Sequence, residues 1–218
     1  MIKTVVFDLD GTLANTLADL AHAMNYALEK HGLRTYPVDD YRHFVGNGID
    51  NLVRVTMADR YTSDGAAVVK ADFNAYYADH CRDYTEAYDG IAELLKRLEN
   101  DGIATAVISN KPDRFVPEIL AALYPEHSFG CTWGQRDGIA RKPDPTALCM
   151  YLKEYGYDKS EALYVGDSNV DVVFAHNAGL KVCGVSWGFR GAEELREAGA
   201  DHIVDHADEL YKLIKRTD

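Results

Sequence analysis

The sequence predicts an α/β fold, a doubly wound parallel sheet with an all-helical unit inserted near its start. Short apolar runs alternate with amphipathic segments from Gly90 onward, as expected for parallel strands joined by crossover helices. The first apolar run, at residues 2–7, is instead followed by a long stretch of helical pattern. We therefore expect a sheet domain formed by residues 1–13 and 89–218, with residues 14–88 as a helical insert.

The first element, at residues 2–7, is β-branched and aromatic, which is typical of a buried strand. Asp8 and Asp10 follow at its carboxyl end, the edge where open parallel α/β sheets bind ligands. Gly11 permits a tight turn there, and an Asp-Gly turn would explain part of the motif. Two carboxylates this close repel each other, however, and a proton or a cation is needed to relieve the repulsion.

The insert has the pattern of several helices. Residues 17–31 place apolar side chains at helical spacing, with Thr16 in position to cap the helix and Gly32 just after it. Residues 49–61 and 66–84 are also predicted to be helical. Tyrosines on or just after the last of these helices are predicted to pack or to contact the hinge: Tyr76, Tyr77, Tyr84 and Tyr88.

In the rest of the chain, predicted helices alternate with predicted strands. The helices are predicted at residues 91–98, 114–123, 146–155 and 170–177, and the strands at residues 104–108, 128–132, 162–165 and 181–185, with a last edge strand at 200–205. This order favours a parallel sheet with crossover helices. The insert leaves the sheet directly after the first strand, so we expect it to lie over the carboxyl edge.

Polar residues follow three further elements. Ser109 comes after the run at 104–108, Lys142 lies in a proline-stiffened turn, and Asp167 and Asp171 follow the run at 162–165. Each alone has an ordinary explanation as a helix cap or a solvated charge. Their order on successive strand ends favours a shared site.

This ordered set resembles the haloacid dehalogenase superfamily. Its hallmarks are Asp-x-Asp, then Ser or Thr, then Lys, then Gly-Asp-x-x-x-Asp, and they correspond here to Asp8 and Asp10, Ser109, Lys142, and the segment 166–171. Within that superfamily the chain is similar to the phosphoglycolate phosphatase-like branch, through Val45-Gly46-Asn47-Gly48 and Ser109-Asn110-Lys111-Pro112. The resemblance covers essentially the whole chain and implies a Rossmann-like core with an inserted cap domain.

The resemblance implies the role of each core residue. Asp8 would be the nucleophile that forms an aspartyl-phosphate, and Asp10 would protonate the leaving oxygen and later take a proton from water. Lys142 would neutralise the phosphate and orient Asp8. The phosphate-binding residues would be Ser109 together with Gly11, Thr12 and Asn110.

The cofactor expected from the resemblance is Mg²⁺, because an oxygen-only, carboxylate-rich site suits a hard cation. Asp8 and Asp167 would supply carboxylate oxygens and Asp10 its backbone carbonyl. Asp171 lies one helical turn after Asp167, so it is either a ligand or a residue that orients the ligands, and we favour the second role.

The cap contributes one further signal. Gly46, Asn47 and Gly48 precede the helix expected from residue 49, whose amides would attract a substrate carboxylate or second phosphate. A turn that simply requires glycine explains the segment equally well. The family commonly has Asp-Ser where this chain has Asn15-Thr16, so the hydroxyl is kept and the acid is lost.

Composition limits the partners. The 218-residue chain carries a net charge of −12, which argues against nucleic acid or an anionic membrane. No transmembrane or signal segment is expected, and the 4 cysteines include no C-x-x-C pair, which disfavours zinc and fits a cytoplasmic protein. We expect a monomer or homodimer that binds a small phosphorylated metabolite.

The function expected from the resemblance is Mg²⁺-dependent hydrolysis of a small phosphomonoester such as 2-phosphoglycolate. The alternatives are an inorganic pyrophosphatase or a sugar-phosphate mutase of the same superfamily, although no basic cap loop of the mutase kind is found. A catalytically idle binding protein is disfavoured, because Asp8, Asp10, Ser109, Lys142 and Asp167 are all present.

Overall fold

The computed structural model describes residues 1–216, and its centre is a six-stranded sheet in which every pair of neighbours is parallel. The strand order is β5-β4-β1-β6-β7-β8. The strands are β1 (Thr4–Phe7), β4 (Ala104–Pro112), β5 (Cys131–Gln135), β6 (Ala162–Gly166), β7 (Lys181–Val185) and β8 (His202–Val204). The predicted doubly wound sheet is therefore confirmed.

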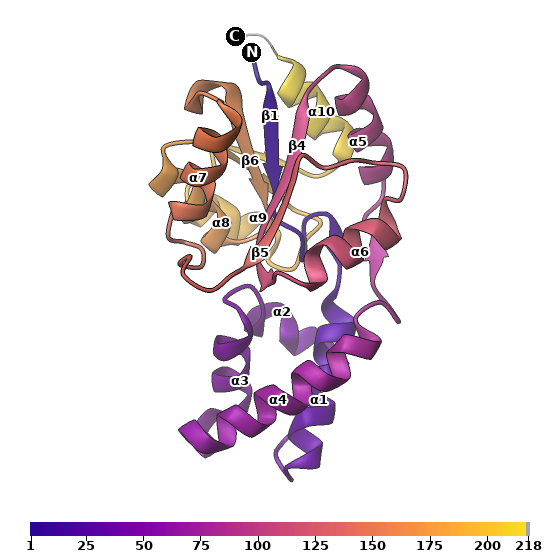
Figure 1. Cartoon of the computed structure of the whole chain (residues 1–218), viewed down its shortest axis with the longest axis vertical. Coiled ribbons are helices and arrows are strands. Elements are labelled where there is room, and N and C mark those ends of the chain that lie inside the picture. The colour runs from indigo at the N-terminus through magenta and orange to yellow at the C-terminus, as the bar shows by residue number, and fades with distance from the viewer. Residues whose placement is uncertain (217–218) are drawn as a thin grey trace.

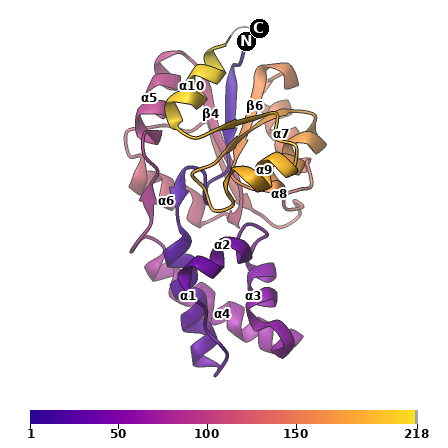
Figure 2. The ribbon, with the colours of Figure 1, turned by 180° about the vertical axis from the view of Figure 1, so that it is seen from behind.

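Helices cover both faces of the sheet (Figures 1 and 2). Along β1, Val5 and Phe7 pack in one buried cluster and Val6 in the other, because successive side chains of a strand point to opposite faces. The first cluster includes α5 (Ile91–Asn100), α6 (Phe115–Leu123) and α10 (Ala207–Lys215). The second includes α7 (Thr146–Tyr155), α8 (Asn169–Ala178) and α9 (Gly191–Glu197).

The winding reverses at β1. After β1 the chain builds β4 and β5 on one side, then crosses to build β6, β7 and β8 on the other. Ligands of open α/β sheets bind outside the carboxyl ends of the strands at such a reversal. The loops that follow β1, β4 and β6 consequently meet at one edge.

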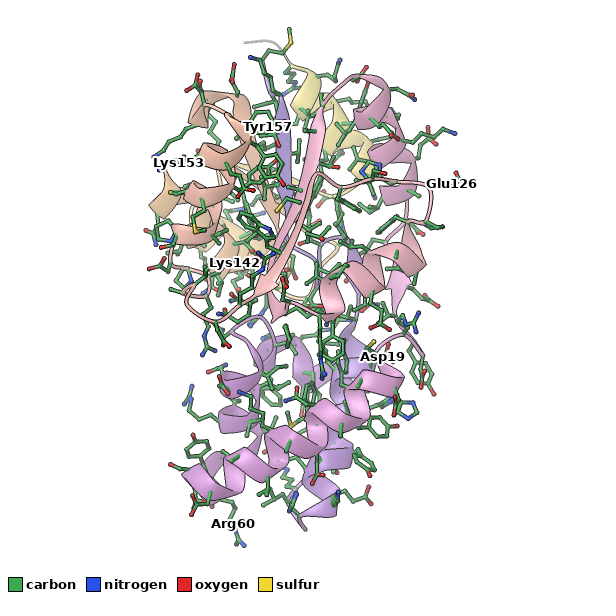
Figure 3. The ribbon with its side chains drawn as sticks, in the orientation of Figure 1. Asp19, Arg60, Glu126, Lys142, Lys153 and Tyr157 are labelled. Atoms are coloured by element: carbon green, nitrogen blue, oxygen red, sulfur yellow. The ribbon has the colours of Figure 1, made fainter. Side chains whose placement is uncertain are left out.

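A helical unit lies at that carboxyl edge, at the opposite end of the molecule from both termini (Figure 1). It contains α1 (Leu17–Lys30), α2 (Tyr41–Phe44), α3 (Ile49–Met57) and α4 (Ser63–His80), with short 3-10 turns at Val38–Asp40 and Ala58–Arg60. Figure 3 places Arg60 at the far end of this unit.

Two short strands connect the helical unit to the sheet domain. β2 (Ala14–Asn15) pairs antiparallel with β3 (Glu86–Ala87). Asp19, near the start of α1 (Figure 3), accepts hydrogen bonds from the Tyr84 amide at 3.0 Å and the Thr85 hydroxyl at 2.7 Å. The entry and exit segments are therefore tied to each other beside the sheet domain.

Several predicted boundaries are wrong. The strand expected to end at Ile108 continues to Pro112, because its ladder with β5 resumes at Pro112 and Gln135 after an irregularity. The helix expected at 66–84 begins at Ser63, where the Thr62 hydroxyl accepts from the Gly65 amide, and it ends at His80. The strand expected at 128–132 lies at 131–135. No helix described in residues 1–216 is long and apolar enough to cross a membrane.

Candidate active site

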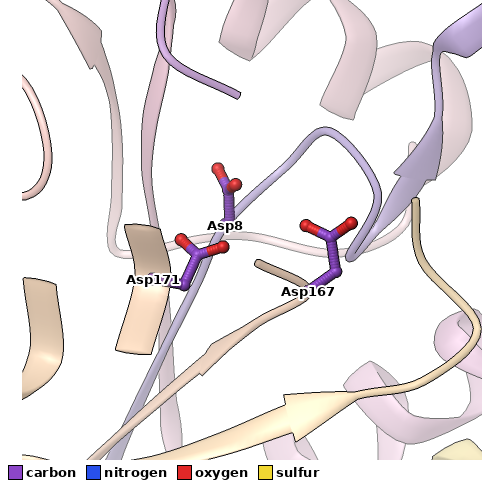
Figure 4. Close-up of side chains that lie close together, drawn as sticks. All are labelled: Asp8, Asp167 and Asp171. Atoms are coloured by element: carbon purple, nitrogen blue, oxygen red, sulfur yellow. The ribbon is translucent and has the colours of Figure 1, made fainter. Parts of the chain in front are cut away.

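Three buried aspartates form the centre of the site. Asp8 follows β1, Asp167 follows β6, and Asp171 lies in the first turn of α8. Their carboxylates each offer an oxygen within 4.8 Å of the others (Figure 4). The sequence predicted this convergence from strand ends, and the sheet order explains it because β1 and β6 are neighbours.

Burial makes this cluster electrostatically unfavourable without a cation. It raises the pKa of Asp8 to about 6, with Asp171 and Asp10 adding to the shift and Lys142 opposing it. Burial, followed by the charges of Asp171 and Asp8, raises the pKa of Asp167 well above its usual range. An oxygen-only donor set of this kind suits a hard divalent cation such as Mg²⁺.

Lys142 supplies positive charge to the same cluster, and Figure 3 places it near the end of the sheet domain that faces the helical unit. Its ammonium lies 3.0 Å from Asp8 Oδ1 and 2.7 Å from Asp171 Oδ1. Burial lowers the pKa of Lys142, but Asp171 and Asp8 outweigh this and raise the pKa to about 12. Lys142 is therefore a fixed cation beside Asp8.

Asp171 is held by the start of α8. Its Oδ2 accepts from the backbone amide of Ser168 at 3.1 Å and from the Ser168 hydroxyl at 2.7 Å, so it completes a capping box. Its Oδ1 accepts from Lys142 and, at 3.1 Å, from the Tyr164 hydroxyl. These contacts favour the predicted orienting role over direct ligation.

Glycines leave room for the acids. Gly11 has a φ of +84°, and a Cβ at this position would collide with the Asp167 carboxylate. A Cβ on Gly188 would also collide with Asp167. The next amide, that of Phe189, donates to Asp167 Oδ2 at 2.7 Å. The sequence reasoning did not assign Gly188 or the Phe189 amide to Asp167, because a backbone donor in a loop has no residue-type signature.

Asp10 has different partners. Its Oδ1 accepts from the Thr16 hydroxyl at 2.6 Å and from the Lys111 ammonium at 2.9 Å. Lys111 also donates to the Tyr77 hydroxyl at 2.7 Å. The expectation that Thr16 caps α1 is wrong in part, since Thr16 stands at the N-cap position but makes no side-chain capping bond. Its hydroxyl is directed to Asp10 instead.

A cavity joins these residues to the helical unit. It is lined by residues of the sheet domain and of the helical unit, namely Asp8, Asp10, Leu20, Val45, Gly46, Gly48, Ile49, Leu52, Tyr77, Ser109, Asn110, Lys111 and Pro112. Asn110 links the two parts, because its side-chain amide donates to the Gly46 carbonyl at 3.0 Å. Its Oδ1 accepts from the backbone amide of Lys142 at 2.8 Å.

Other predicted residues lie around this cavity. Asn47 accepts a hydrogen bond from Arg141 at 3.0 Å through its carbonyl oxygen. Thr12 is buried, and within residues 1–216 its hydroxyl has no hydrogen-bond partner, while its carbonyl accepts from the Trp187 indole at 3.1 Å. The roles predicted for Gly11, Thr12 and Asn47 in phosphate or substrate binding stay predictions.

The sequence reasoning also missed the contacts of Lys111 and Tyr77 with the site. The segment 109–112 was identified from the sequence, but its strand was expected to end at Ile108, so strand alternation did not indicate where the Lys111 side chain points. Tyr77 was predicted only to pack or to contact the hinge, since a helical tyrosine gives no sign of a polar partner.

Comparisons with known proteins identify the family of this chain. A family model described as haloacid dehalogenase-like hydrolase matches residues 5–185. The phosphoglycolate phosphatase of Pseudomonas fluorescens (strain Pf0-1) is 35% identical over 97% of this chain and 78% of its own length. That of Mannheimia succiniciproducens is 32% identical over 97% of this chain and 98% of its own length. A crystal structure from Lactobacillus delbrueckii subsp. bulgaricus, 34% identical, superposes with a TM-score of 0.92 over 97% of this chain and 98% of that one.

Proposed function

Because the chain belongs to the haloacid dehalogenase-like hydrolase family, we propose that it is a Mg²⁺-dependent phosphatase that hydrolyses 2-phosphoglycolate or a similar small phosphomonoester through an aspartyl-phosphate. The observation that carries the proposal is the placement of Asp8 and Asp10 in one cavity, each with a fixed cation beside it. The curated relatives named above are phosphoglycolate phosphatases.

Asp8 is proposed as the nucleophile. A carboxylate oxygen attacks phosphorus, the bond to the leaving oxygen breaks, and the enzyme holds the phosphoryl group as a mixed anhydride. Lys142, 3.0 Å from Asp8, keeps the carboxylate oriented and offsets charge on the phosphoryl oxygens. Ser109, which lines the same cavity, donates its hydroxyl to one of those oxygens.

Mg²⁺ is proposed to be held by Asp8 and Asp167, with the backbone carbonyl of Asp10. When bound it would neutralise negative charge on the phosphate and on the carboxylates. Asp171 supports this set indirectly, because its oxygens are already occupied by Lys142, Ser168 and Tyr164. The chemistry of the donors supports the choice of metal.

Asp10 is proposed as the acid and base. It gives a proton to the leaving alkoxide in the first step and takes one from the attacking water in the second. Asp8 cannot take this role because it is bonded to phosphorus in between. Asp10 lines the cavity next to Asp8, where a leaving group would lie.

We propose residues 14–88 as a cap domain that selects the substrate. Gly46, Gly48 and Ile49, at and just before the start of α3, line the same cavity as Asp8 and Asp10. Amides at a helix start attract anions, so a carboxylate at the far end of a small phosphoester would lie there. Apolar side chains of Leu20 and Leu52 in the same cavity favour a compact substrate.

The test is phosphate release from a panel of small phosphates with and without Mg²⁺. Selective Mg²⁺-dependent release from 2-phosphoglycolate is expected, with little from hexose phosphates. Preferred release from pyrophosphate would reassign the substrate, and conversion of a sugar phosphate without release would indicate a mutase. No turnover of any phosphate would contradict the proposal.

A further inference from the structure

The mechanism above gives no role to the buried, charged side chain of Lys111. Lys111 comes from β4 in the sheet domain, and its side chain is only 1% exposed. Its ammonium lies 2.9 Å from Asp10 Oδ1 and 2.7 Å from the hydroxyl of Tyr77 on α4. A buried ammonium must be paired to be tolerated, and both of its polar partners here line the candidate active-site cavity.

We propose that Lys111 and Tyr77 are positioning residues that hold Asp10 for proton transfer. Tyr77, a residue of the helical unit, would thus help to position the acid of the sheet domain. This inference rests on the proposed role of Asp10. It assigns a function to a pair of residues that link the two parts of the molecule.

The two oxygens of Asp10 are not equivalent. Both the Lys111 ammonium and the Thr16 hydroxyl donate to Oδ1. Within residues 1–216, no hydrogen bond holds Oδ2. Oδ2 is therefore the oxygen left free to exchange a proton with the leaving group, and the donors on Oδ1 prevent the carboxyl group from rotating away from that arrangement.

Tyr77 is itself fixed by both parts of the molecule. Its ring stacks on Phe73 of α4 with centroids 5.3 Å apart, and it meets the edge of Phe115 of α6 at 4.9 Å. Its hydroxyl accepts from Lys111. Movement of the helical unit away from the sheet domain would separate Tyr77 from Phe115 and Lys111 and leave that end of Lys111 without its partner.

The step that this arrangement serves can be written in full. An oxygen of Asp8 bonds to phosphorus, the bond between phosphorus and the ester oxygen breaks, and its electron pair stays on that oxygen. The proton on Asp10 Oδ2 moves to the same oxygen, which leaves as a neutral alcohol. The charge left on Asp10 is stabilised at Oδ1 by Lys111 and Thr16.

The need for that proton depends on the leaving group, and this gives the test. Ethyl phosphate must expel a basic alkoxide, whereas acetyl phosphate, of similar size, expels acetate and needs no proton. We would measure kcat/KM, which reports the first step, for these two substrates and for 2-phosphoglycolate. The proteins are wild type, Lys111→Met, Tyr77→Phe and Tyr41→Phe.

Tyr41→Phe is a matched control, because Tyr41 is a buried tyrosine of the helical unit whose hydroxyl donates to Asn25 at 2.7 Å, away from the cavity. We expect Lys111→Met to lower kcat/KM for ethyl phosphate and 2-phosphoglycolate by about 10- to 100-fold, a part of what general acid catalysis supplies. Tyr77→Phe should cost about 3- to 10-fold on the same basis. Acetyl phosphate should be nearly unaffected in both.

Other results would overturn the inference. Equal losses with ethyl and acetyl phosphate would show that the pair only supports the fold. A rise in KM confined to 2-phosphoglycolate would show that Lys111 binds the substrate carboxylate instead. If Lys111→Met does not fold, the kcat/KM values of Tyr77→Phe for ethyl and acetyl phosphate test the inference by themselves. A wild type that hydrolyses ethyl phosphate but not 2-phosphoglycolate would contradict the proposed substrate while leaving this comparison intact, and a wild type inactive on all three would contradict the proposed function.

Discussion

Asp8 and Asp10 are separated by a single residue, yet their surroundings are built from different parts of the molecule. Asp8 Oδ1 contacts the Leu9 amide and Lys142, both in the sheet domain. Asp10 Oδ1 contacts Thr16, at the start of α1, and Lys111, which leads to Tyr77 in the helical unit. The sheet domain alone fixes the proposed nucleophile, whereas the proposed acid depends on where the helical unit lies.

This difference has a functional meaning. A nucleophile held only by the sheet domain stays ready whether or not the helical unit is closed over it. An acid held from both sides would reach its position only with the helical unit in place. The arrangement would thus limit phosphoryl transfer to the closed enzyme.

The largest effect should separate the two aspartates. Asp8→Asn removes the nucleophile at nearly constant volume, so kcat/KM should fall by about 10⁴-fold or more for ethyl and acetyl phosphate alike. Asp10→Asn should lower it by about 10²- to 10⁴-fold for ethyl phosphate and far less for acetyl phosphate. Steady-state phosphate release measures both, and near-wild-type activity of Asp8→Asn would refute the covalent mechanism.

The next effect concerns the acids held by the sheet domain. It is tested by comparing Gly11→Ala with Gly102→Ala. Both glycines have positive φ, +84° and +70°, so both substitutions carry the backbone cost. A Cβ added at Gly11 collides with the Asp167 carboxylate, whereas a Cβ added at Gly102 has nothing within 4 Å. Gly11→Ala should therefore raise the Mg²⁺ concentration needed for activity by about 10- to 100-fold.

Gly102→Ala should leave that Mg²⁺ requirement unchanged and lose only stability. A titration of activity with Mg²⁺ and a thermal unfolding curve for each variant separate the two quantities. An unchanged requirement in Gly11→Ala would mean that the Asp167 carboxylate is not part of the metal site.

Mg²⁺ should stabilise the fold more at high pH than at low pH. Burial raises the pKa of Asp8 to about 6 and holds the pKa of Asp167 well above its usual range, so the folded state binds protons that the unfolded state has released. Ionisation of these groups then destabilises the metal-free fold as pH rises through the folded-state pKa values. Mg²⁺ must displace the protons at low pH but not at high pH.

The measurement is the shift in Tm produced by a fixed Mg²⁺ concentration at about pH 5.5 and about pH 8, on either side of the Asp8 pKa. The shift should be larger at the higher pH in wild type and small at both in Asp167→Asn. Equal shifts at the two pH values in wild type would contradict the proposal that these acids hold the metal.

Much of this comparison was accessible from the sequence. The sheet and its inserted helices follow from apolar periodicity, and the residues at the carboxyl edge follow from the strands that precede them. Asp8, Ser109 and Asp167 could be placed together because parallel strands end at the same edge. Local pattern is sufficient when the feature is itself local to one strand and its turn.

The contacts between the two parts were not accessible in this way. Lys111 and Tyr77 are 34 positions apart and belong to different units, so no periodicity connects them. Thr16 was predicted to cap α1 from its position, but two orientations of its side chain compete, one toward the first amides of α1 and one toward Asp10 six residues earlier, and the structure has the second. Deciding that competition requires the path of the turn at Gly11, which only the structure supplies.

The smallest effect should come from Thr16, the second donor to Asp10 Oδ1. Thr16→Val keeps the shape and removes the hydroxyl, while Lys111 still holds the same oxygen. A neutral donor contributes less than an ammonium, so kcat/KM for ethyl phosphate should fall only about 2- to 5-fold, which corresponds to about 0.4–1 kcal/mol and matches a single hydrogen bond. Thr16→Ser keeps the hydroxyl and should remain close to wild type. If Thr16→Val instead lost as much as Lys111→Met, the hinge hydroxyl rather than the buried lysine would be the main group that positions Asp10, and the dependence of the acid on Tyr77 and α4 would have to be given up.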